Sequence, residues 1–355
     1  MLIQQSISLK NYNTFQIDAK AAYFVEITTE EDIKNLISNE VRTSHPHLIL
    51  GGGANLLFTK DYDGLVVKVS LLWKEIVEEK DGLVYVKAGA GEDWHETMMR
   101  MLEQGLVWCE NLVYIPWQVG SAPVGNIWAY GKEAKDIIFS VEAIDLKSWE
   151  KKVYSNAECK FAYRDSIFKH EMKGRYLITS VIFQVKKETD DYTPDTQYKD
   201  IQQAIASQSL TKVSGLEVAH MIIEIRKKKL PDRHEIWTAG SFFKNPVINK
   251  TKYDELIKKF PTLIWREISS WATQSAIRNP RSNNSKIKLS AGQLIELVGM
   301  KWYRQWDVGV ADNHALILLN YGNGTGQELV ALADTIQKKV LEQFDVQLEP
   351  EVLYI

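Results

Sequence analysis

The clearest fold signal in the chain is His47-Leu48-Ile49-Leu50-Gly51-Gly52-Gly53-Ala54-Asn55. Its apolar first half predicts a short buried strand, and the glycines predict a loop directly at the end of that strand. Residues 24–27 predict an earlier strand. Between the two, Thr28 and Glu31 have the spacing of a capping box ahead of apolar residues at helical intervals. Strand, helix, strand and glycine loop together indicate a βαβ start.

Three loops of small residues lie in the first half of the chain, at 51–55, 88–91 and 115–131, and the first two directly follow predicted strands. Glycine lets a backbone approach a ligand closely and turn several N–H groups toward an anion. A simple tight turn explains an isolated triple glycine equally well, and no G-x-G-x-x-G opens a helix here. Three such loops in one region favour an extended ligand that carries phosphate.

The rest of the chain mixes helix and strand signals. Strands are predicted at 65–69, 83–87, 177–183 and 346–355, and helices after Ser214 and Thr325, each with Glu three residues on. The polar stretch 186–199 is the expected domain boundary. Residues 261–288, rich in Asn, Arg and Ser, are expected to form a long loop. The pattern predicts an α+β protein in three lobes.

Composition narrows the function classes. The 355 residues are 45% hydrophobic and 25% charged, as in globular proteins, and the net charge of −3 gives no bulk positive field for nucleic acid. Two cysteines and singly scattered histidines provide neither a disulfide framework nor metal-ligand spacing, so no metal is expected. Without a signal pattern or a membrane-length apolar run, a soluble cytoplasmic protein is expected.

Candidate chemistry gathers first around basic residues. Arg164 lies between Tyr163 and Asp165, where an Arg–Asp surface pair is the simpler interpretation. The basic run 226–229 ends a predicted helix, and cations favour the helix dipole there without any ligand. Neither segment alone identifies a binding site.

The segment 239–246 is more unusual, because Ser241 follows a small-residue turn and precedes two aromatic residues and Lys244. No His in triad order accompanies it, so nucleophilic hydrolysis is weakly supported. A serine held there could instead donate a proton. Glu351, near the C-terminus, is expected to be exposed when it is read alone.

In chain order these segments resemble the UDP-N-acetylenolpyruvoylglucosamine reductase family. The most specific matches are 163–169 and 240–246, and the segment around Tyr198 resembles the extra loop of the family's longer class. The matching stretches cover nearly the whole chain: 13–15, 48–58, 88–95, 110–133, 163–170, 225–232, 239–246, 288–294 and 348–352.

The resemblance implies an FAD-dependent oxidoreductase that uses NADPH to reduce UDP-N-acetylglucosamine enolpyruvate to UDP-N-acetylmuramate in peptidoglycan precursor synthesis. By analogy, Ser241 protonates the substrate carbon, while Arg164 and protonated Glu351 stabilise an enolate-like intermediate. The implied FAD-binding residues are Gly51, Gly52, Gly53, Ala54, Asn55, Gly120, Ser121, Asn126, Tyr130 and Gly131. The implied substrate or NADPH contacts are Tyr163, Tyr198, Arg226, Lys229, Asn245, Lys301 and His314.

The family's organisation also carries over as an expectation. It implies a two-lobed FAD-binding domain of the PCMH/VAO-like kind, with lobes at 1–72 and 73–200, followed by an α+β substrate-binding domain at 201–345. Residues 346–355 are expected to return to the active site as a strand. The implied partner is a small-molecule UDP-sugar, with no nucleic acid and no membrane, and the chain is expected to be a cytoplasmic monomer.

Tryptophan stands at several positions where the family has glycine: Trp108, Trp117, Trp128, Trp237, Trp302 and Trp306. Gln16 and Lys199 also replace expected glycines. A left-handed glycine site strains a tryptophan, and an indole could occupy the flavin cavity. A flavin-free relative that binds nucleotide sugar is therefore a second hypothesis. A third, a different FAD oxidoreductase, is opposed by the joint presence of Ser241, Arg164 and Glu351.

Because most of these expected glycines are replaced by the same residue, tryptophan, we favour a difference in the genetic code over random mutational drift. Drift would spread replacements over Ala, Ser and Asn, which are sterically closer to glycine. Some lineages read UGA as glycine where another common code reads tryptophan, so we hypothesise that many of these residues are glycine in the native protein. The alternative is genuine tryptophan that fills a vacated cavity.

Overall fold

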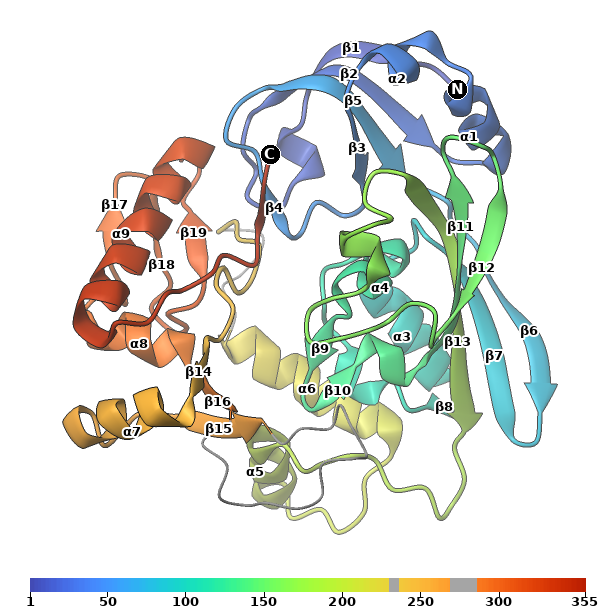
Figure 1. The fold of residues 1–355 in the computed structure, drawn as a ribbon. Helices are drawn as coiled ribbons and strands as arrows, with labels where there is room; N and C mark the ends of the chain where they lie inside the picture. The colour runs from blue at the N-terminus through green and yellow to red at the C-terminus, as the bar shows by residue number, and fades with distance from the viewer. Residues whose placement is uncertain (230–235, 269–285) are drawn as a thin grey trace. The chain divides into compact units, whose positions relative to one another are not determined.

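The computed structural model describes residues 1–229, 236–268 and 286–355. These residues divide into two compact units, whose elements are labelled in Figure 1. Unit 1 comprises Met1–Tyr12, Lys20–Ala54 and Asp61–Lys228, and unit 2 comprises Asn13–Ala19, Asn55–Lys60 and Lys229–Ile355. The finer division into lobes at 1–72, 73–200 and 201–345 stays a prediction.

The first sheet of unit 1 has the strand order β1-β2-β5-β3. Its elements are β1 (Gln4–Ser8), β2 (Lys20–Ile27), α1 (Glu30–Ile37), α2 (Glu40–Ser44), β3 (His47–Leu50) and β5 (Tyr62–Val69). β2 and β3 both pair in parallel with β5, and helices connect β2 to β3. The predicted βαβ start is confirmed, and the glycine loop leaves the carboxyl end of β3.

Helix α1 is capped one residue later than the sequence predicted. The side chain of Thr29, not Thr28, accepts the backbone N–H of Asp32 at 3.1 Å. Asp32 in turn accepts the backbone N–H groups of Thr28 and Thr29. The run Thr-Thr-Glu-Glu-Asp offers two overlapping capping boxes, and the shorter Asp carboxylate reaches the backbone in the one that forms.

The second sheet of unit 1 is antiparallel, with the order β12-β11-β13-β7-β6 and β8 pairing with β13. Its strands are β6 (Lys74–Lys80), β7 (Leu83–Gly89), β8 (Leu106–Val107), β11 (Ile138–Asp145), β12 (Lys151–Ser155) and β13 (Tyr176–Lys187). Helix α3 (Trp94–Glu103) packs in the same core, where the rings of Trp94 and Phe183 are 5.6 Å apart. The predicted strands at 83–87 and 177–183 are confirmed.

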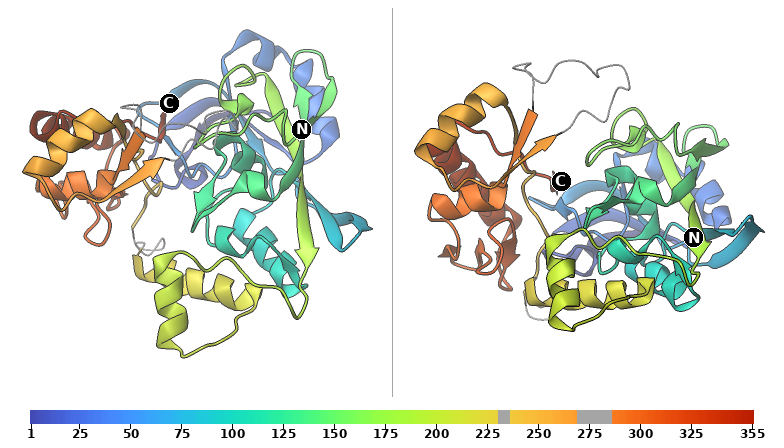
Figure 2. Two further views of the ribbon diagram at one scale, coloured as in Figure 1. Left: turned by 60° about the horizontal axis from the view of Figure 1, so that its bottom comes forward. Right: turned by 90° about the horizontal axis from the view of Figure 1, so that it is seen from below.

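Shorter elements complete unit 1. They are α4 (Ala122–Gly125), β9 (Trp128–Ala129), β10 (Lys132–Glu133), α5 (Lys199–Ser207) and α6 (Gly215–Lys229), which ends at the first residue of unit 2. Helices α5 and α6 lie side by side in both views of Figure 2. The predicted cap of α6 is confirmed, because Ser214 and Glu217 exchange side-chain-to-backbone hydrogen bonds.

Unit 2 contains the antiparallel sheets β14-β16-β15 and β17-β18-β19 and the parallel pair β20-β4. Its elements are β4 (Leu56–Leu57), β14 (Val247–Asn249), α7 (Lys250–Lys259), β15 (Trp265–Ile268), β16 (Lys286–Leu289), α8 (Ala291–Leu297), β17 (Arg304–Gln305), β18 (Val308–Val310), β19 (Leu318–Asn320), α9 (Gly326–Phe344) and β20 (Leu353–Tyr354). The predicted capping box of Thr325 and Glu328 at the start of α9 is confirmed.

Two predictions for unit 2 need correction. The C-terminal strand predicted at 346–355 is limited to Leu353–Tyr354. Upstream of it, the Leu348 carbonyl accepts a hydrogen bond from the Gln337 side chain of α9 rather than from a strand. The loop predicted at 261–288 ends in strands β15 and β16, while 269–285 lie outside the described residues. Strand β15 was not predicted because its described side chains are exposed, so no alternation of buried apolar residues marks it in the sequence.

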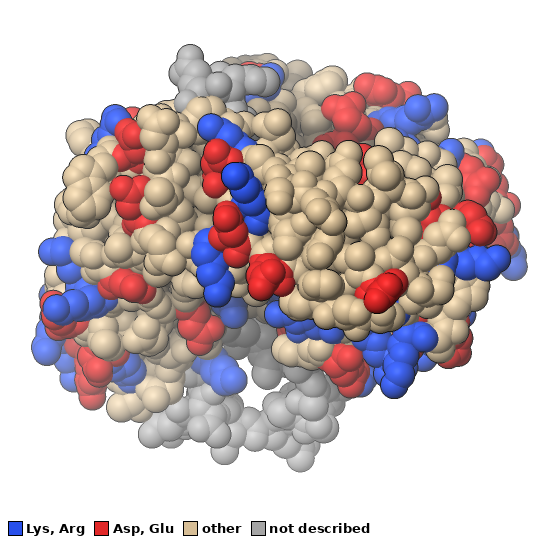
Figure 3. Space-filling view, turned by 90° about the horizontal axis from the view of Figure 1, so that it is seen from above, with Lys and Arg blue, Asp and Glu red and all other residues tan. Residues whose placement is uncertain are grey.

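Surface charge agrees with the small net charge of the chain. On the face drawn in Figure 3, Lys and Arg are interspersed with Asp and Glu, and wide areas carry neither. Within the described parts of the chain, no helix is long and apolar enough to cross a membrane.

Candidate active site

The three small-residue loops predicted to carry a ligand meet in unit 1. The backbone N–H of Gly120 donates to the Ala90 carbonyl at 2.9 Å. A Cβ atom on Gly120 would lie 2.6 Å from the Ala90 Cβ, and one on Gly51 would lie 2.2 Å from the Ser121 Oγ. A side chain at position 120 would collide with Ala90, and one at position 51 would displace the Ser121 hydroxyl, so the loops approach one another closely.

The last part of the third loop is held by Asn126, which is fully buried and has a φ of 41°. Its Nδ2 donates to Glu133 Oε2 and to the Ala162 carbonyl, both at 2.9 Å, and its Oδ1 accepts the N–H of Lys135 at 3.1 Å. Tyr130 and Gly131 follow with φ values of 46° and 90°. One side chain thus connects this loop to the segment that precedes Arg164.

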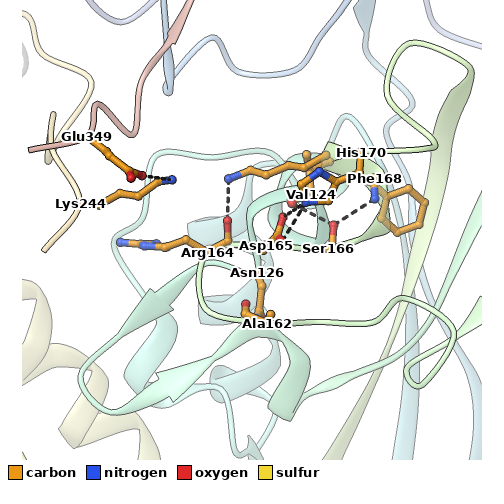
Figure 4. A network of polar contacts seen from close by, with 11 residues as sticks. Val124, Asn126, Ala162, Arg164, Asp165, Ser166, Phe168, His170, Lys244 and Glu349 are labelled. Carbon is orange, nitrogen blue, oxygen red and sulfur yellow. Dashed lines mark hydrogen bonds and ion pairs between the residues drawn. The ribbon is translucent and has the colours of Figure 1, made fainter. Parts of the chain in front are cut away.

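Arg164 lies in a tight turn with a φ of 56°, closed by backbone hydrogen bonds between Ala162 and Asp165 (Figure 4). Its carbonyl accepts the Lys169 Nζ at 2.7 Å. The Ser166 hydroxyl donates to the Val124 carbonyl at 2.9 Å. The surface pair considered from sequence is not formed with Arg164, because the Asp165 carboxylate contacts His170 Nε2 at 2.8 Å.

FAD, which the resemblance implies, fits the loops of unit 1. A diphosphate needs close backbone approach and several N–H donors, which glycine loops provide. Residues 51–54 leave the carboxyl end of parallel strand β3, the edge at which open α/β sheets bind ligands, and Gly53 has a φ of 65°. Gly120 and Ser121 lie beside them. The cradle is therefore suited to a dinucleotide.

Two bulky side chains differ from the small residues of the loop at 115–131. The half-buried Trp117 ring packs against Gly125, where an added Cβ atom would lie 3.0 Å from Trp117 Cη2. The Trp128 ring lies at the other end of the loop, 6.4 Å from the Tyr198 ring. Both indoles flank the predicted flavin loop of unit 1.

In unit 2, Ser241 is fixed by strand-like bonds on both sides of its segment. Ser241 forms an isolated β-bridge with Ile317, and the neighbouring Phe242 donates its N–H to the Leu316 carbonyl at 2.8 Å. Phe242 and Phe243 are buried, with ring centroids 5.1 Å apart. The Ser241 hydroxyl therefore projects from a rigid backbone.

Glu351 lies on the segment that pairs with the other edge of the serine segment. Its N–H donates to the Phe242 carbonyl at 2.8 Å, and Lys244 donates its N–H to the Glu349 carbonyl at 2.9 Å. The Lys244 and Glu349 side chains form an ion pair at 3.3 Å, also drawn in Figure 4. Unit 2 thus brings together Ser241 and Glu351, two of the predicted catalytic residues.

The C-terminus is anchored to the last residue of the first glycine loop, Asn55, and to the residues that follow it in the chain. Leu353 donates its N–H to the Asn55 carbonyl at 3.1 Å, and the Asn55 side chain donates to the Glu351 carbonyl at 3.3 Å. Downstream, Ile355 pairs with Leu57 and Thr59. Asn55, predicted to bind FAD, is therefore engaged with the segment that carries Glu351.

Two of the predicted substrate residues of unit 1, Tyr198 and Arg226, lie close to Tyr130. Burial raises the pKa of Tyr130 to about 12, and the charge of Arg226 opposes the shift. The Tyr198 ring lies 5.0 Å from the Tyr130 ring, and the Arg226 Nε donates to the Tyr114 carbonyl at 3.1 Å. Tyr163, beside Arg164, is exposed.

The predicted substrate residues of unit 2 are more dispersed. The Asn245 Oδ1 accepts the Ala291 N–H at 2.9 Å and thereby connects the serine segment to the first residue of α8. Lys301 pairs with Glu296 at 2.9 Å. His314 lies in the turn before β19, where its carbonyl accepts the Ile317 N–H. Lys229 is the last residue of α6 and is exposed.

Named relatives match the chain from end to end. The UDP-N-acetylenolpyruvoylglucosamine reductase of Flavobacterium johnsoniae is 41% identical over 352 residues, which are 99% of each chain. The chain belongs to the UDP-N-acetylenolpyruvoylglucosamine reductase family. The enzyme of the same name from Chromobacterium violaceum is 41% identical over 350 residues, 98% of each chain.

Domain matches and a solved structure agree with this reductase family. Residues 21–148 match the family of FAD binding domains, and residues 231–355 match the C-terminal domain of UDP-N-acetylenolpyruvoylglucosamine reductase. The crystal structure of the Thermus caldophilus reductase superposes with a TM-score of 0.66 at 22% identity, covering 99% of each chain. The predicted α+β fold with its FAD-binding domain is confirmed.

Several tryptophans at expected glycine positions of the reductase have glycine-like backbones. Trp108, Trp302 and Trp306 have φ values of 94°, 68° and 54°. Gln16, also expected to be glycine, has a φ of 52°. Among the described residues, Trp117, Trp128 and Trp237 do not have positive φ, so the predicted backbone strain does not apply to them.

Sequence reasoning missed two residues that connect the loops of unit 1. Lys68, on β5, donates its Nζ to Gly51 O at 3.0 Å and to Gln118 Oε1 at 3.1 Å. Gln118 donates its Nε2 to Gly91 O at 2.8 Å. The available signal was a lysine within an otherwise apolar strand, Leu65-Val66-Val67-Lys68-Val69.

Proposed function

We propose that this chain catalyses the NADPH-dependent reduction of UDP-N-acetylglucosamine enolpyruvate to UDP-N-acetylmuramate, with FAD as its cofactor. The observation that carries the proposal is end-to-end similarity to named reductases at 41% identity, together with the convergence of the three small-residue loops in unit 1. Bound FAD would supply a two-electron carrier between NADPH and the enolpyruvyl double bond.

The residues of the chain would hold the substrate and move the proton. The Ser241 hydroxyl would donate a proton to the substrate carbon, and its paired backbone keeps the oxygen in place. Arg164 would stabilise the negative charge that develops on the substrate carboxylate, because guanidinium stays charged and can donate two hydrogen bonds. Protonated Glu351 would act in the same stabilisation.

The remaining assignments extend this proposal. FAD would lie along 51–55 and 120–131 of the two lobes, and the substrate domain would supply Asn245, Lys301 and His314. The UDP-sugar and NADPH would also contact Tyr163, Tyr198, Arg226 and Lys229. We place the enzyme in the cytoplasm as a monomer, serving cell-wall synthesis and hence cell shape, growth and division.

The visible absorbance spectrum of the purified protein tests the proposal against a flavin-free relative. A flavin absorbance band that releases FAD on denaturation supports the reductase. A colourless, folded protein that binds UDP-sugar without taking up added FAD would contradict it. The presence of Ser241, Arg164 and Glu351 in one chain favours the first result.

A further inference from the structure

The interior of unit 1 contains a lysine that none of the assignments above uses. Lys68 lies on β5, whose neighbours Leu65, Val66 and Val67 are fully buried. Burial lowers the pKa of Lys68 from its ordinary value, with the nearby Glu26 carboxylate opposing the shift. A desolvated ammonium is costly unless its donors are used. Its hydrogen-bond partners therefore indicate what the lysine does.

The two closer partners of Lys68 belong to two of the small-residue loops. Its Nζ donates to Gly51 O, to Gln118 Oε1 and, more weakly at 3.4 Å, to Val69 O. These bonds match the three donors of an ammonium group. Lys68 thus joins the first loop, through its backbone, to the third loop, through a side chain.

Gln118 extends this connection to the second loop. Its Nε2 donates to Gly91 O at 2.8 Å, while residue 118 forms a β-bridge with Asp93. The fit around the glutamine is close, because a Cβ atom on Gly51 would lie 3.3 Å from Gln118 Oε1. One Lys–Gln pair therefore connects the loops at 51–55, 88–91 and 115–131.

We propose that Lys68, acting through Gln118, is the positioning residue that sets the spacing of the three loops for FAD. This inference rests on the proposed flavin site. Lys68 itself contacts carbonyl and amide oxygens and need not touch the cofactor. Its removal should let the loops separate without disturbing the sheet that carries them.

The test compares Lys68→Met with Lys87→Met. Lys87, on β7 of the same unit, is also largely buried, and its ammonium group pairs with Glu142 at 2.8 Å instead of with a residue of the three loops. Losing a buried charge-assisted hydrogen bond corresponds to about tenfold or more in binding. We therefore expect Lys68→Met to raise the FAD dissociation constant at least ~10-fold, measured by flavin fluorescence, and Lys87→Met to leave it within about twofold.

A second readout needs no cofactor. In the flavin-free protein, hydrogen exchange at 51–54 and 116–121 should be faster in Lys68→Met than in Lys87→Met, and Lys68→Arg should restore part of the protection. Unchanged exchange and unchanged FAD affinity in Lys68→Met would overturn the inference. If the unmodified protein binds no FAD at all, the proposed function fails instead, and the exchange experiment still decides the role of Lys68.

A different observation concerns the backbone at tryptophan. Among the described residues, Trp108, Trp149, Trp302 and Trp306 have φ values between 54° and 94°, in the left-handed region that favours glycine. Trp302 and Trp306 are also 69% and 70% exposed, so their indoles bury little surface in return. Trp149 was not among the positions expected to be glycine from the sequence, and its positive φ alone adds it to this group.

The hairpin of β17 and β18 shows most clearly that tryptophan occupies a backbone position that favours glycine. Gln305 pairs with Val308, so the connection is the two-residue loop Trp306-Asp307. Of these two residues, Trp306 alone has a positive φ, as in a type II′ turn, whose first central residue is usually glycine. Trp149 lies in the longer turn between β11 and β12, directly before Glu150, whose carbonyl accepts the Asp145 N–H at 2.9 Å.

We infer that the codons at 108, 149, 302 and 306 are read as glycine in the source cell, so that the native protein carries glycine there. Peptide masses of the protein isolated from its own cells decide this directly. Each of the four peptides should be lighter by the difference between tryptophan and glycine. Tryptophan in those peptides would overturn the inference.

The recombinant protein carrying tryptophan supplies an independent test. Trp302→Gly and Trp306→Gly should raise the melting temperature, whereas Trp→Gly ordinarily lowers it. The matched control is Trp94→Gly, because Trp94 is fully buried in α3 and donates to the Leu112 carbonyl at 2.7 Å. That variant should melt lower. A fall in melting temperature for both Trp302→Gly and Trp306→Gly would refute the strain on which the inference depends.

Discussion

Replacing Asn126 tests whether its hydrogen bonds connect the loop at 115–131 to the turn that contains Arg164. Asn126→Ala removes two donated hydrogen bonds at 2.9 Å, to Glu133 and to the Ala162 carbonyl, and one accepted bond from Lys135 at 3.1 Å. The site is fully buried and its φ is 41°. We expect the variant to be less stable and to bind FAD more weakly.

The magnitude follows from these contacts. Neutral bonds contribute about 0.5–1.5 kcal/mol each and the bond to the Glu133 carboxylate about 1.5–3 kcal/mol, so the free energy of unfolding should fall by roughly 2–4 kcal/mol after partial resolvation. The backbone adds a second effect, since an alanine in the left-handed region costs about 1 kcal/mol more than glycine. Asn126→Gly should therefore be about 1 kcal/mol more stable than Asn126→Ala.

Denaturant unfolding of the wild type and both variants checks this order. The glycine variant removes more atoms than the alanine variant, so simple loss of packing would make it the less stable of the two. An alanine variant as stable as wild type, or a glycine variant less stable than alanine, would refute the reasoning. Flavin titration of the same proteins shows whether the loop depends on these bonds.

Three further outcomes are expected. Ser241→Ala should slow reoxidation of the reduced enzyme by substrate by about 10²–10⁴ while leaving reduction by NADPH nearly unchanged; equal loss in both steps would exclude its acid role. Glu351→Gln should retain more turnover than Glu351→Ala. Deletion of 345–355 removes the pairing with Leu56–Leu57 and should abolish turnover. A fully active truncated protein would contradict the expected role of the C-terminal segment. Burial raises the pKa of Asp32, but hydrogen bonds from Thr28 and Thr29 outweigh this effect and lower the pKa to about 2. The wild type should therefore be more stable than Asp32→Asn above about pH 4, and acid-unfolding curves should show this advantage disappear as the pH falls toward 2.

Local patterns predicted the parts of the fold that depend on neighbouring residues. The strand at His47–Leu50 and the helix caps at Ser214 and Thr325 were found because periodicity and capping act over a few residues. The same signals failed at Thr28, where Thr29 offered an equal choice one residue later. They also failed near the C-terminus, where 346–349 bond to other segments instead of continuing a strand.

In the candidate site as well, short local motifs were predictable and contacts between distant residues were not. The glycine loops and Ser241 were recognised as short motifs, and Ser241 and Glu351 do lie on bonded segments of unit 2. The Lys68–Gln118 pair could not be predicted, because its partners are 50 residues apart. Gln118 lies in the loop recognised at 115–131, but no local pattern connects it to a lysine on another strand. Trp149 escaped notice as well, since only backbone geometry marks its position as one that favours glycine.

The central claim is that this protein passes electrons from NADPH to an enolpyruvyl sugar nucleotide through bound FAD. Anaerobic stopped-flow absorbance on one sample tests it most directly. NADPH should bleach the flavin absorbance, and subsequent addition of UDP-N-acetylglucosamine enolpyruvate should restore it with formation of one UDP-N-acetylmuramate per flavin. Flavin that NADPH bleaches and this substrate fails to reoxidise would contradict the assigned reaction.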